Sequence, residues 1–284
     1  MANHIPDVIQ ILTYADDGED ARHYRFRLSQ QTQHNPWPGT RPGQFFMLNV
    51  PGTGEAPFTF TSPPDSDGEF SAFIRKMGQV TGALFKLKPG DILGARGPFG
   101  RGWPMQELSG KHIVLLAGGC GLAPLVNVID TLIDQQISPP AEIALIYGAR
   151  NPDAQMLTPQ RLSWQHKIHL FNTFDELPDD YETGNGKYPQ LLNSCRGTPL
   201  DILPEVLANF ARPPAIALLC GPEQMMQAAA TELVDYGLDA GAIFLSVERR
   251  MHCALGLCGH CYLKHVYACK QGPTFSWQAL QPLL

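Results

Sequence analysis

Four cysteines near the carboxyl end of the chain have a spacing that suits metal ligation. They follow the pattern C-x4-C-x2-C-x7-C within seventeen residues. An iron–sulfur cluster needs four thiolates that converge on one small core, and the C-x4-C-x2-C part is the spacing of plant-type 2Fe–2S ferredoxins. The spacing therefore predicts a 2Fe–2S cluster held by Cys253, Cys258, Cys261 and Cys269.

A structural zinc ion is the alternative, because four cysteine thiolates also satisfy tetrahedral zinc. Zinc ribbons normally carry two C-x2-C pairs, and this segment contains one, from Cys258 to Cys261. The iron–sulfur interpretation is therefore favoured over zinc. The other three cysteines are scattered along the chain, and a reducing compartment would leave them as thiols.

A glycine-rich segment is the first candidate for nucleotide binding. Residues 117–124 read AGGCGLAP and connect an expected strand with an expected helix. Glycines at such a position let the backbone approach a pyrophosphate, whose negative charge a helix N-terminus favours. The segment is not G-x-G-x-x-G, so by itself an ordinary strand-to-helix turn explains it equally well. The residues assigned to the nucleotide here are Gly118, Gly119, Gly121 and Pro124.

Two further expected strands end in residues that could face the same ligand. In a parallel sheet, ligands bind beyond the carboxyl ends of the strands, so Cys220, Gly221 and Pro222 would flank a nucleotide. Arg150, at the end of another strand, would reach a phosphate or a ribose. The alternatives are ordinary ones, with Cys220 as a small buried hydrophobic residue and Arg150 as a solvated arginine.

Two segments in the first hundred residues could hold a flavin. In Pro57-Phe58-Thr59, a hydroxyl can hydrogen-bond a flavin ring edge while the neighbouring aromatic side chain packs on the ring. In residues 78–81, Gly-Gln-Val-Thr, we expect Thr81 to open a helix whose N-terminus suits a phosphate. An ordinary strand and an ordinary helix cap are the alternatives.

The elements that must position these residues fall into three regions. Residues 1–107 contain short strands separated by Pro and Gly, which indicates an antiparallel β-barrel. Residues 108–247 alternate apolar strands with helices, which indicates a parallel sheet covered on both faces. Residues 248–284 are irregular and cysteine-rich, and we expect a third, small module. The expected strands are 24–28, 45–50, 58–61, 69–75, 113–117, 143–147, 168–174, 216–220 and 243–247.

Composition and charge exclude several classes of protein. The chain has 284 residues, 44% of them hydrophobic and 17% charged, which is a globular balance with room for two domains of ordinary size. A net charge of −6 argues against an obligate nucleic-acid binder. The apolar residues 112–133 include three glycines, a proline and an aspartate, so no membrane span is expected. The first sixteen residues lack the pattern of a secretory signal, and we expect a cytoplasmic protein.

The order of these motifs resembles the ferredoxin–NADP reductase superfamily, in the branch that carries a C-terminal 2Fe–2S cluster. That branch includes the electron-transfer subunit of dihydroorotate dehydrogenase, the B subunit of anaerobic sulfite reductase and the gamma subunit of cytoplasmic nickel–iron hydrogenases (sulfhydrogenases). The resemblance covers roughly residues 8 to 284, and residues 97–104, GPFGRGWP, are most similar to hydrogenase gamma subunits. The matching motifs are 57–59, 78–81, 97–100, 118–124, 220–222 and 248–251, which leads into the cysteines.

The resemblance implies an FAD-binding barrel, an NAD(P)-binding domain and a cluster module, with a role for each motif. Pro57, Phe58 and Thr59 would lie along the flavin ring, and Gly78, Val80 and Thr81 would hold the flavin phosphates. Gly119, Gly121 and Cys220 would border the nicotinamide nucleotide. Ala56 stands where many relatives have an arginine, which removes a pyrophosphate contact and leaves FAD or FMN open. The candidate catalytic residues are Thr59, Cys220 and Glu248.

The activity implied by the resemblance is that of a diaphorase subunit. Such a subunit passes electrons between NAD(P)H and partner subunits, in a nickel–iron hydrogenase or sulfhydrogenase, or alternatively in an anaerobic sulfite reductase or a dihydroorotate dehydrogenase. The partners would be iron–sulfur and catalytic subunits, because this chain shows no active site for hydrogen or sulfite. A zinc-binding regulator that has kept a reductase fold is the alternative from a different class. The sequence does not separate NADH from NADPH.

Overall fold

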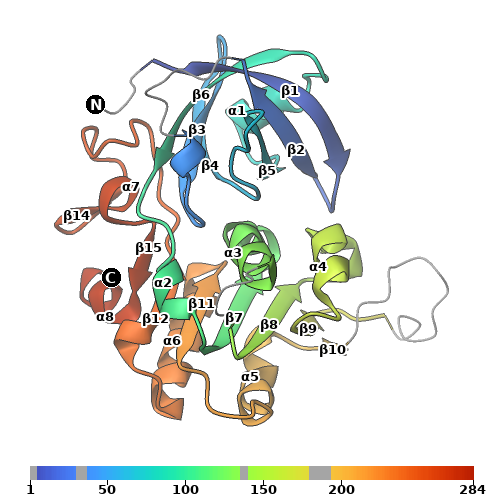
Figure 1. Ribbon diagram of the computed structural model, residues 1–284, viewed down its shortest axis with the longest axis vertical. Coiled ribbons are helices and arrows are strands. Elements are labelled where there is room, and N and C mark those ends of the chain that lie inside the picture. Colours follow the sequence, from blue (N-terminus) through green and yellow to red (C-terminus); the bar gives the residue numbers. More distant parts are fainter. Residues whose placement is uncertain (1–4, 30–36, 135–139, 179–192) are drawn as a thin grey trace.

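The computed structural model describes residues 5–29, 37–134, 140–178 and 193–284. Figure 1 shows the N-terminal barrel above the nucleotide-binding sheet, with the C-terminal segment running along one side from the sheet to the barrel. None of the helices in these described ranges combines the length and hydrophobicity that a membrane span requires. Short 3-10 helices are η1 (Trp37–Gly39), η2 (Gly119–Leu122), η3 (Pro152–Ala154), η4 (Ala240–Ala242) and η5 (Gln281–Leu283).

The N-terminal region is an antiparallel six-stranded sheet in the order β4-β3-β6-β1-β2-β5. The N–H of Thr61, just after β4, donates to the carbonyl of Ser71 on β5 at 2.9 Å, which brings the two edges of the sheet together. Aromatic side chains fill the interior, with Phe46 and Phe60 ring centres 4.8 Å apart. The elements are β1 (Asp7–Asp16), β2 (Ala21–Leu28), β3 (Phe45–Val50), β4 (Gly54–Thr59), β5 (Glu69–Arg75), α1 (Gln79–Leu84) and β6 (Ile92–Phe99).

The second region is a seven-stranded sheet in the order β10-β9-β8-β7-β11-β12-β15, parallel except for the last strand. Apolar residues of α3 and α4 pack on one face and those of α5 and α6 on the other, so the strands are buried on both faces. The elements are α2 (Met105–Leu108), β7 (His112–Gly118), α3 (Ala123–Asp134), β8 (Glu142–Ala149), α4 (Thr158–Trp164), β9 (His169–Phe174), β10 (Ser194–Arg196), α5 (Pro199–Ala208), β11 (Ile216–Cys220), α6 (Glu223–Tyr236) and β12 (Ile243–Ser246).

The C-terminal residues are joined to both preceding regions. β15 extends the parallel sheet by antiparallel pairing with β12, with Phe275 opposite Leu245. On the barrel side, the N–H of Arg101 donates to the carbonyl of Gly272 at 2.7 Å. The cysteine-rich module is therefore fixed between the barrel and the sheet. Its elements are β13 (Tyr262–Leu263), β14 (Val266–Tyr267), α7 (Ala268–Gln271), β15 (Thr274–Ser276) and α8 (Trp277–Leu280).

The expected fold class is confirmed, and several element boundaries differ from the expectation. β1 and β6 were not expected as strands, and β4 ends at Thr59 although the sequence suggested a strand over 58–61. β6 contains two glycines and a proline, residues that are depleted in strands, so local propensity opposes the conformation that sheet pairing enforces.

Candidate functional site

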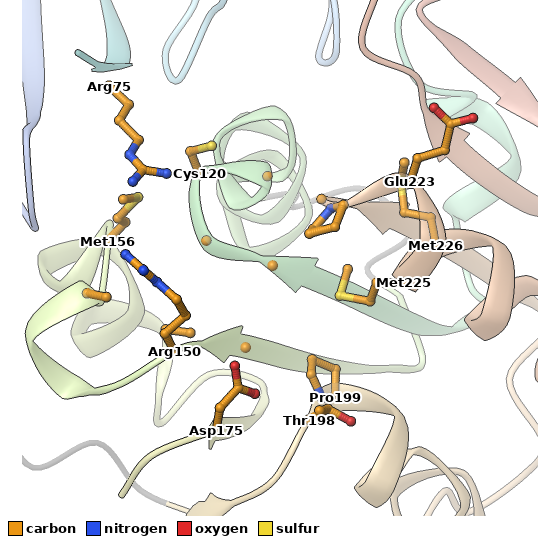
Figure 2. Close-up of a pocket in the computed structure, with 18 of the residues that line it drawn as sticks. Arg75, Cys120, Arg150, Met156, Asp175, Thr198, Pro199, Glu223, Met225 and Met226 are labelled. Carbon is orange, nitrogen blue, oxygen red and sulfur yellow. The ribbon is translucent and has the colours of Figure 1, made fainter. Parts of the chain in front are cut away.

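A cavity of about 700 Å³ lies at the carboxyl ends of the central parallel strands. From β7 the chain moves to β8 on one side, and β11 lies on the other side. This change of direction is the topological switch point at which open α/β sheets bind ligands. Figure 2 shows Arg75 reaching in from the barrel and Arg150 from the end of β8, while Met225 and Met226 line the opposite side.

Close packing of backbone brings the ends of β7 and β11 together beside this cavity. A Cβ on Gly121 would lie 2.5 Å from the Cα of Gly221, so a side chain at this position would force the two strand ends apart. Gly119 has a φ of +53°, and a Cβ there would meet no atom within 4 Å. Its backbone therefore stays open to a ligand in a conformation that favours glycine.

The structure brings together most of the residues that the sequence assigned to the nucleotide. Two of the predicted residues do not border the cavity: the Pro124 carbonyl accepts a hydrogen bond from Nε1 of Trp103 at 2.9 Å, and Cys220 is only 1% exposed. Pro124 thus lies in the first turn of α3, where it contacts Trp103, and Cys220 lies in the sheet beneath the cavity. The predicted residues that do line it are Gly118, Gly119, Gly121, Arg150, Gly221, Pro222 and Glu248.

Beside the predicted Arg150, one arginine and two carboxylates that were not predicted from the sequence also border the cavity: Arg75, Glu19 and Asp175. The Nε of Arg75 is buried and has no hydrogen-bond partner among the described residues. Arg150 pairs with Glu19 at 3.3 Å, and both side chains are more than 60% exposed, so this ion pair is weak. Asp175, directly after β9, also lines the cavity. The two cations suit a pyrophosphate, and the carboxylate suits the hydroxyl groups of a ribose.

The thiols near the cavity are protonated groups and not activated nucleophiles. Burial, followed by the charge of Glu248, raises the pKa of Cys120. Burial and the same charge raise the pKa of Cys220 well above its usual range. Burial also raises the pKa of Glu248 itself. Because thiol reactivity depends on the thiolate, neither cysteine is prepared for covalent chemistry here.

Strand β4 offers a partly exposed apolar surface for a flavin. All six of its residues are partly exposed, although Phe58 also packs on Phe46 with ring centres 6.3 Å apart. Oγ1 of Thr59 donates to the carbonyl of Gln44 at 3.1 Å. Because its proton is used in this bond, the Thr59 oxygen is left to act as an acceptor toward a ligand. Pro57, Phe58 and Thr59 thus fit the edge and face of a flat aromatic ring.

The phosphate segment differs in detail from the prediction. Thr81 does not open the helix: Gly78 is the N-cap, and α1 begins at Gln79. Oγ1 of the buried Thr81 accepts hydrogen bonds from the N–H groups of Met77 and Gly78, each at 2.9 Å. Gly78 adopts an extended conformation three residues after the end of β5, and Thr81 occupies the third helical position. Thr81 therefore shapes the turn through its hydroxyl, and Val80 stays half-buried beside it.

Three of the four cysteines of the third module lie on a tight loop, which we call the cluster loop (residues 252–261), and Cys269 follows in α7. Sγ of Cys253 accepts hydrogen bonds from the N–H groups of Leu255 at 3.3 Å, Leu257 at 3.3 Å and Cys258 at 3.4 Å. Sγ of Cys269 accepts one from Gly256 at 3.1 Å. Backbone N–H groups aimed at sulfur stabilise thiolates, so these residues fit an iron–sulfur cluster.

The thiols are arranged as two pairs. The thiol of Cys253 is the one that acts on Cys258, and the thiol of Cys261 is the one that acts most strongly on Cys269. No three His, Cys, Asp or Glu side chains in the described part of the chain converge as ligands of one metal ion. Two pairs fit two iron ions that share four thiolates. Backbone hydrogen bonds, first from His260, lower the pKa of the exposed Cys258 to about 7, whereas burial and its neighbour Cys261 raise that of Cys269 to about 12.

Family models match all three regions of the chain. An oxidoreductase FAD-binding domain matches residues 10–103, and an oxidoreductase NAD-binding domain matches residues 115–231. The iron–sulfur cluster binding domain of dihydroorotate dehydrogenase B matches residues 248–281. The predicted FAD, nicotinamide and iron–sulfur cofactors are thereby confirmed at the level of their domains.

Similar proteins include subunits of two kinds of enzyme. The gamma subunit of sulfhydrogenase 2 from Pyrococcus furiosus is 34% identical over 248 residues, which is 84% of each chain. A probable electron-transfer subunit of dihydroorotate dehydrogenase B (NAD(+)) from Pyrococcus horikoshii is 32% identical over 240 residues, covering 84% of this chain and 81% of that one.

Among solved structures, an NADH-dependent reduced ferredoxin-NADP oxidoreductase shares the fold, with a TM-score of 0.73 and 22% identity over all of this chain and 94% of the other. The domains, their order and these relatives confirm the resemblance seen in the sequence. The chain belongs to the ferredoxin–NADP reductase-like flavoproteins, in the iron–sulfur branch that contains sulfhydrogenase gamma subunits and dihydroorotate dehydrogenase B electron-transfer subunits.

Proposed function

We propose that this oxidoreductase subunit passes electrons between a nicotinamide nucleotide and a partner subunit through FAD and a 2Fe–2S cluster. The observation that supports the proposal is that three candidate sites adjoin one another. The nucleotide cavity borders the barrel at Arg75, and the barrel borders the cluster loop at Arg96. One chain therefore supplies an entry site, a flavin surface and an exit site in series.

Each site has a separate task in this proposal. The glycines at 119 and 121 admit the nucleotide pyrophosphate, and Arg75 and Arg150 offset its charge. Pro57, Phe58 and Thr59 hold the flavin ring, while residues 78–81 shape the turn that receives its phosphates. When bound, a flavin exchanges hydride with a nicotinamide and single electrons with an iron–sulfur cluster. The chain contributes placement, which removes the entropic cost of separate encounters.

The exit site would be Cys258. It is the exposed member of the four cysteines, and the neighbouring Leu257 is 74% exposed. A partner subunit with its own redox centre could approach the cluster most closely here. We propose the regions 1–107, 108–247 and 248–284 as the flavin, nucleotide and cluster domains, and a cytoplasmic complex as the setting.

The sulfhydrogenase 2 gamma subunit and the dihydroorotate dehydrogenase B subunit described above both fit this arrangement. We favour a sulfhydrogenase-type complex, because residues 97–104 resemble hydrogenase gamma subunits and lie directly against the C-terminal module: a Cβ on Gly100 would meet Pro273 at 2.7 Å. Sulfite reductase and dihydroorotate dehydrogenase complexes are the alternatives.

The test is anaerobic purification with co-eluting subunits, followed by flavin, iron, acid-labile sulfide and zinc analysis. We expect FAD, the iron and sulfide of one 2Fe–2S cluster per chain, and bleaching of the flavin by NADH or NADPH. Co-eluting hydrogenase subunits would support the favoured complex. A colourless protein that contains zinc but neither flavin nor sulfide would overturn the proposal and support a regulatory zinc protein instead.

A further inference from the structure

The barrel and the cluster loop meet around one buried arginine. Arg96, on β6, is 6% exposed and pairs with Met47 in the barrel sheet. A buried cation is strongly unfavourable unless its charge is paired and its N–H groups are hydrogen-bonded. The partners of this guanidinium therefore show what holds it between the two regions.

The N–H groups of Arg96 point in two directions. Toward the barrel, Nε donates to Oε1 of Glu55 at 3.0 Å and Nη2 donates to Oε2 at 2.5 Å, a bidentate ion pair. Toward the third module, Nη1 donates to the backbone carbonyl of Cys253 at 3.2 Å, and Nη2 reaches that of His252 at 3.5 Å. One side chain thus connects the strand that carries the flavin residues with the peptide of the first cluster cysteine.

Apolar packing surrounds these hydrogen bonds. Phe99, also on β6, has its ring centre 5.7 Å from the guanidinium carbon. It shares a hydrophobic cluster with Phe45 of the barrel and with Ala254 and Cys261 of the cluster loop. Phe45 is in turn paired with Thr59 of the flavin strand. The connection is therefore largely buried and packed against apolar side chains, which strengthens its hydrogen bonds and limits relative movement.

We propose that Arg96 is a positioning residue that fixes the cluster loop relative to the flavin strand and so sets the rate of electron transfer between the two cofactors. This inference rests on the proposed function. Arginine is suited to the task because its planar fork can bind a carboxylate with one edge while it donates to carbonyl oxygens with the remaining N–H groups. A lysine ammonium could keep the charge but not the full geometry.

The test compares Arg96→Met, Arg96→Lys and Glu55→Gln with the control Arg27→Gln. Arg27 pairs with Glu69 on the barrel surface, where its side chain is 48% exposed. Three quantities are measured in the full-length protein: the rate of flavin reduction by the nucleotide, the following rate of cluster reduction, and the electron paramagnetic resonance spectrum of the dithionite-reduced cluster.

In Arg96→Met we expect flavin reduction at the wild-type rate and cluster reduction slowed about 10- to 100-fold, the size of effect that a misplacement of about 1 Å can cause. The resonance lines should broaden, because the released loop samples several positions. Arg96→Lys should recover part of the rate of cluster reduction. Glu55→Gln should lower that rate by a smaller factor than Arg96→Met. Arg27→Gln should match the wild type in every measurement.

A wild-type spectrum and a wild-type rate of cluster reduction in Arg96→Met would overturn the inference. Equal loss of flavin reduction and cluster reduction would also overturn it, because that result indicates a general folding role. If Arg96→Met does not fold, Glu55→Gln decides by the same criteria. The spectrum of dithionite-reduced protein requires no nucleotide. If the wild-type protein accepts no electrons from NADH or NADPH, the proposed function is wrong, but the role of Arg96 can still be measured.

Discussion

The nucleotide cavity is bordered by polar groups with unused bonding capacity, whereas in the cluster loop sulfur atoms already accept hydrogen bonds from the backbone. The buried Nε of Arg75 has no partner among the described residues, and the ion pair of Arg150 is exposed. By contrast, Sγ of Cys253 alone accepts three backbone N–H groups.

This difference follows from what each site has to bind. A nucleotide enters and leaves in every turnover, so its site gains from charges that become paired only when the ligand arrives. A cluster stays bound, so its site gains from a loop whose backbone N–H groups already hydrogen-bond the ligand sulfur atoms. Substitutions that change one site at a time test whether the other site is affected.

The largest effect is expected from Cys258→Ser. Loss of a ligand should exceed the effect of losing a neighbouring group, which is about 10- to 100-fold, so electron delivery to a partner or to a one-electron acceptor dye should fall more than about 100-fold. Flavin reduction by the nucleotide should stay near the wild-type rate, because no residue of the cluster loop lines the cavity. Stopped-flow absorbance separates the two steps.

The matched control is Cys195→Ser, which changes the same atom in the half-exposed strand β10, away from the cluster loop. It should leave both steps intact. Unchanged electron delivery in Cys258→Ser would show that the cluster is not the exit route.

The second effect is expected from Gly121→Val in the cavity. The added side chain would collide with Gly221, whose Cα lies 2.5 Å from the Cβ position. Overpacking of this kind costs about 1–3 kcal/mol, so nucleotide binding should weaken by about 5- to 150-fold if the strand ends separate. The resonance spectrum of the cluster should not change.

Nucleotide affinity is best measured by titration of the oxidised protein. Gly39→Ala serves as the control, because a Cβ at that glycine meets no atom within 4 Å. A native affinity in Gly121→Val would show that the strand ends tolerate separation, and the close-packed description of the cavity would be wrong.

A smaller effect is expected from Asp175→Asn. Asp175 lines the cavity directly after β9, and its backbone N–H donates to the carbonyl of Ala149 at 3.3 Å. A carboxylate at this edge favours a ribose hydroxyl and repels a 2′-phosphate. One charge at about 4 Å in water is worth about 1 kcal/mol, so the ratio of kcat/KM for NADPH over NADH should rise about fivefold.

Steady-state rates with both nucleotides measure this ratio, and Asp67→Asn on the barrel surface is the charge-matched control. A ratio that stays constant in Asp175→Asn would place the 2′ position of the ribose elsewhere in the cavity. Cluster spectra should be identical in all three proteins.

The sequence predicts the parts of these sites that lie close together in the chain. The cysteine spacing and the glycines at 118, 119, 121 and 221 could be assigned because each works within a few residues of its neighbours or at a strand end. Arg75 and Asp175 could not be assigned, because they come from different elements and meet only through the packing of the barrel on the sheet.

The same limit explains what was missed in the fold. β6 has the sequence ILGARGPF. Its glycines and proline are depleted in strands, so neither the strand nor the role of the arginine within it was predicted. Only the pairing of Met47 with Arg96 and the ion pair to Glu55 show why an arginine is needed there. In β6, strand pairing with distant residues therefore determined the secondary structure against the local propensity of the sequence.

The smallest effect concerns pH and the contact between the barrel and the nucleotide domain. His23 on β2 bonds Oγ1 of Thr61 at 2.7 Å and Nε2 of Gln160 on α4 at 3.1 Å. Burial lowers the pKa of His23, so the folded protein holds it neutral. As pH falls below the unfolded value of about 6.5, the unfolded chain takes up a proton that the folded chain refuses, and stability decreases.

Above that pH, His23 is neutral in both the folded and the unfolded state, and its titration does not change the stability. The midpoint of thermal unfolding should therefore fall more steeply between about pH 7.5 and about pH 5.5 (about one unit either side of that value) in the wild type than in His23→Gln. Gln can keep one of the two hydrogen bonds but does not titrate. Equal slopes in the two proteins would show that His23 does not control this contact. Loss of nucleotide binding before loss of the cluster spectrum on acidification would place the weak point at this contact, since the cluster loop is tied to the barrel through Arg96 and not through His23.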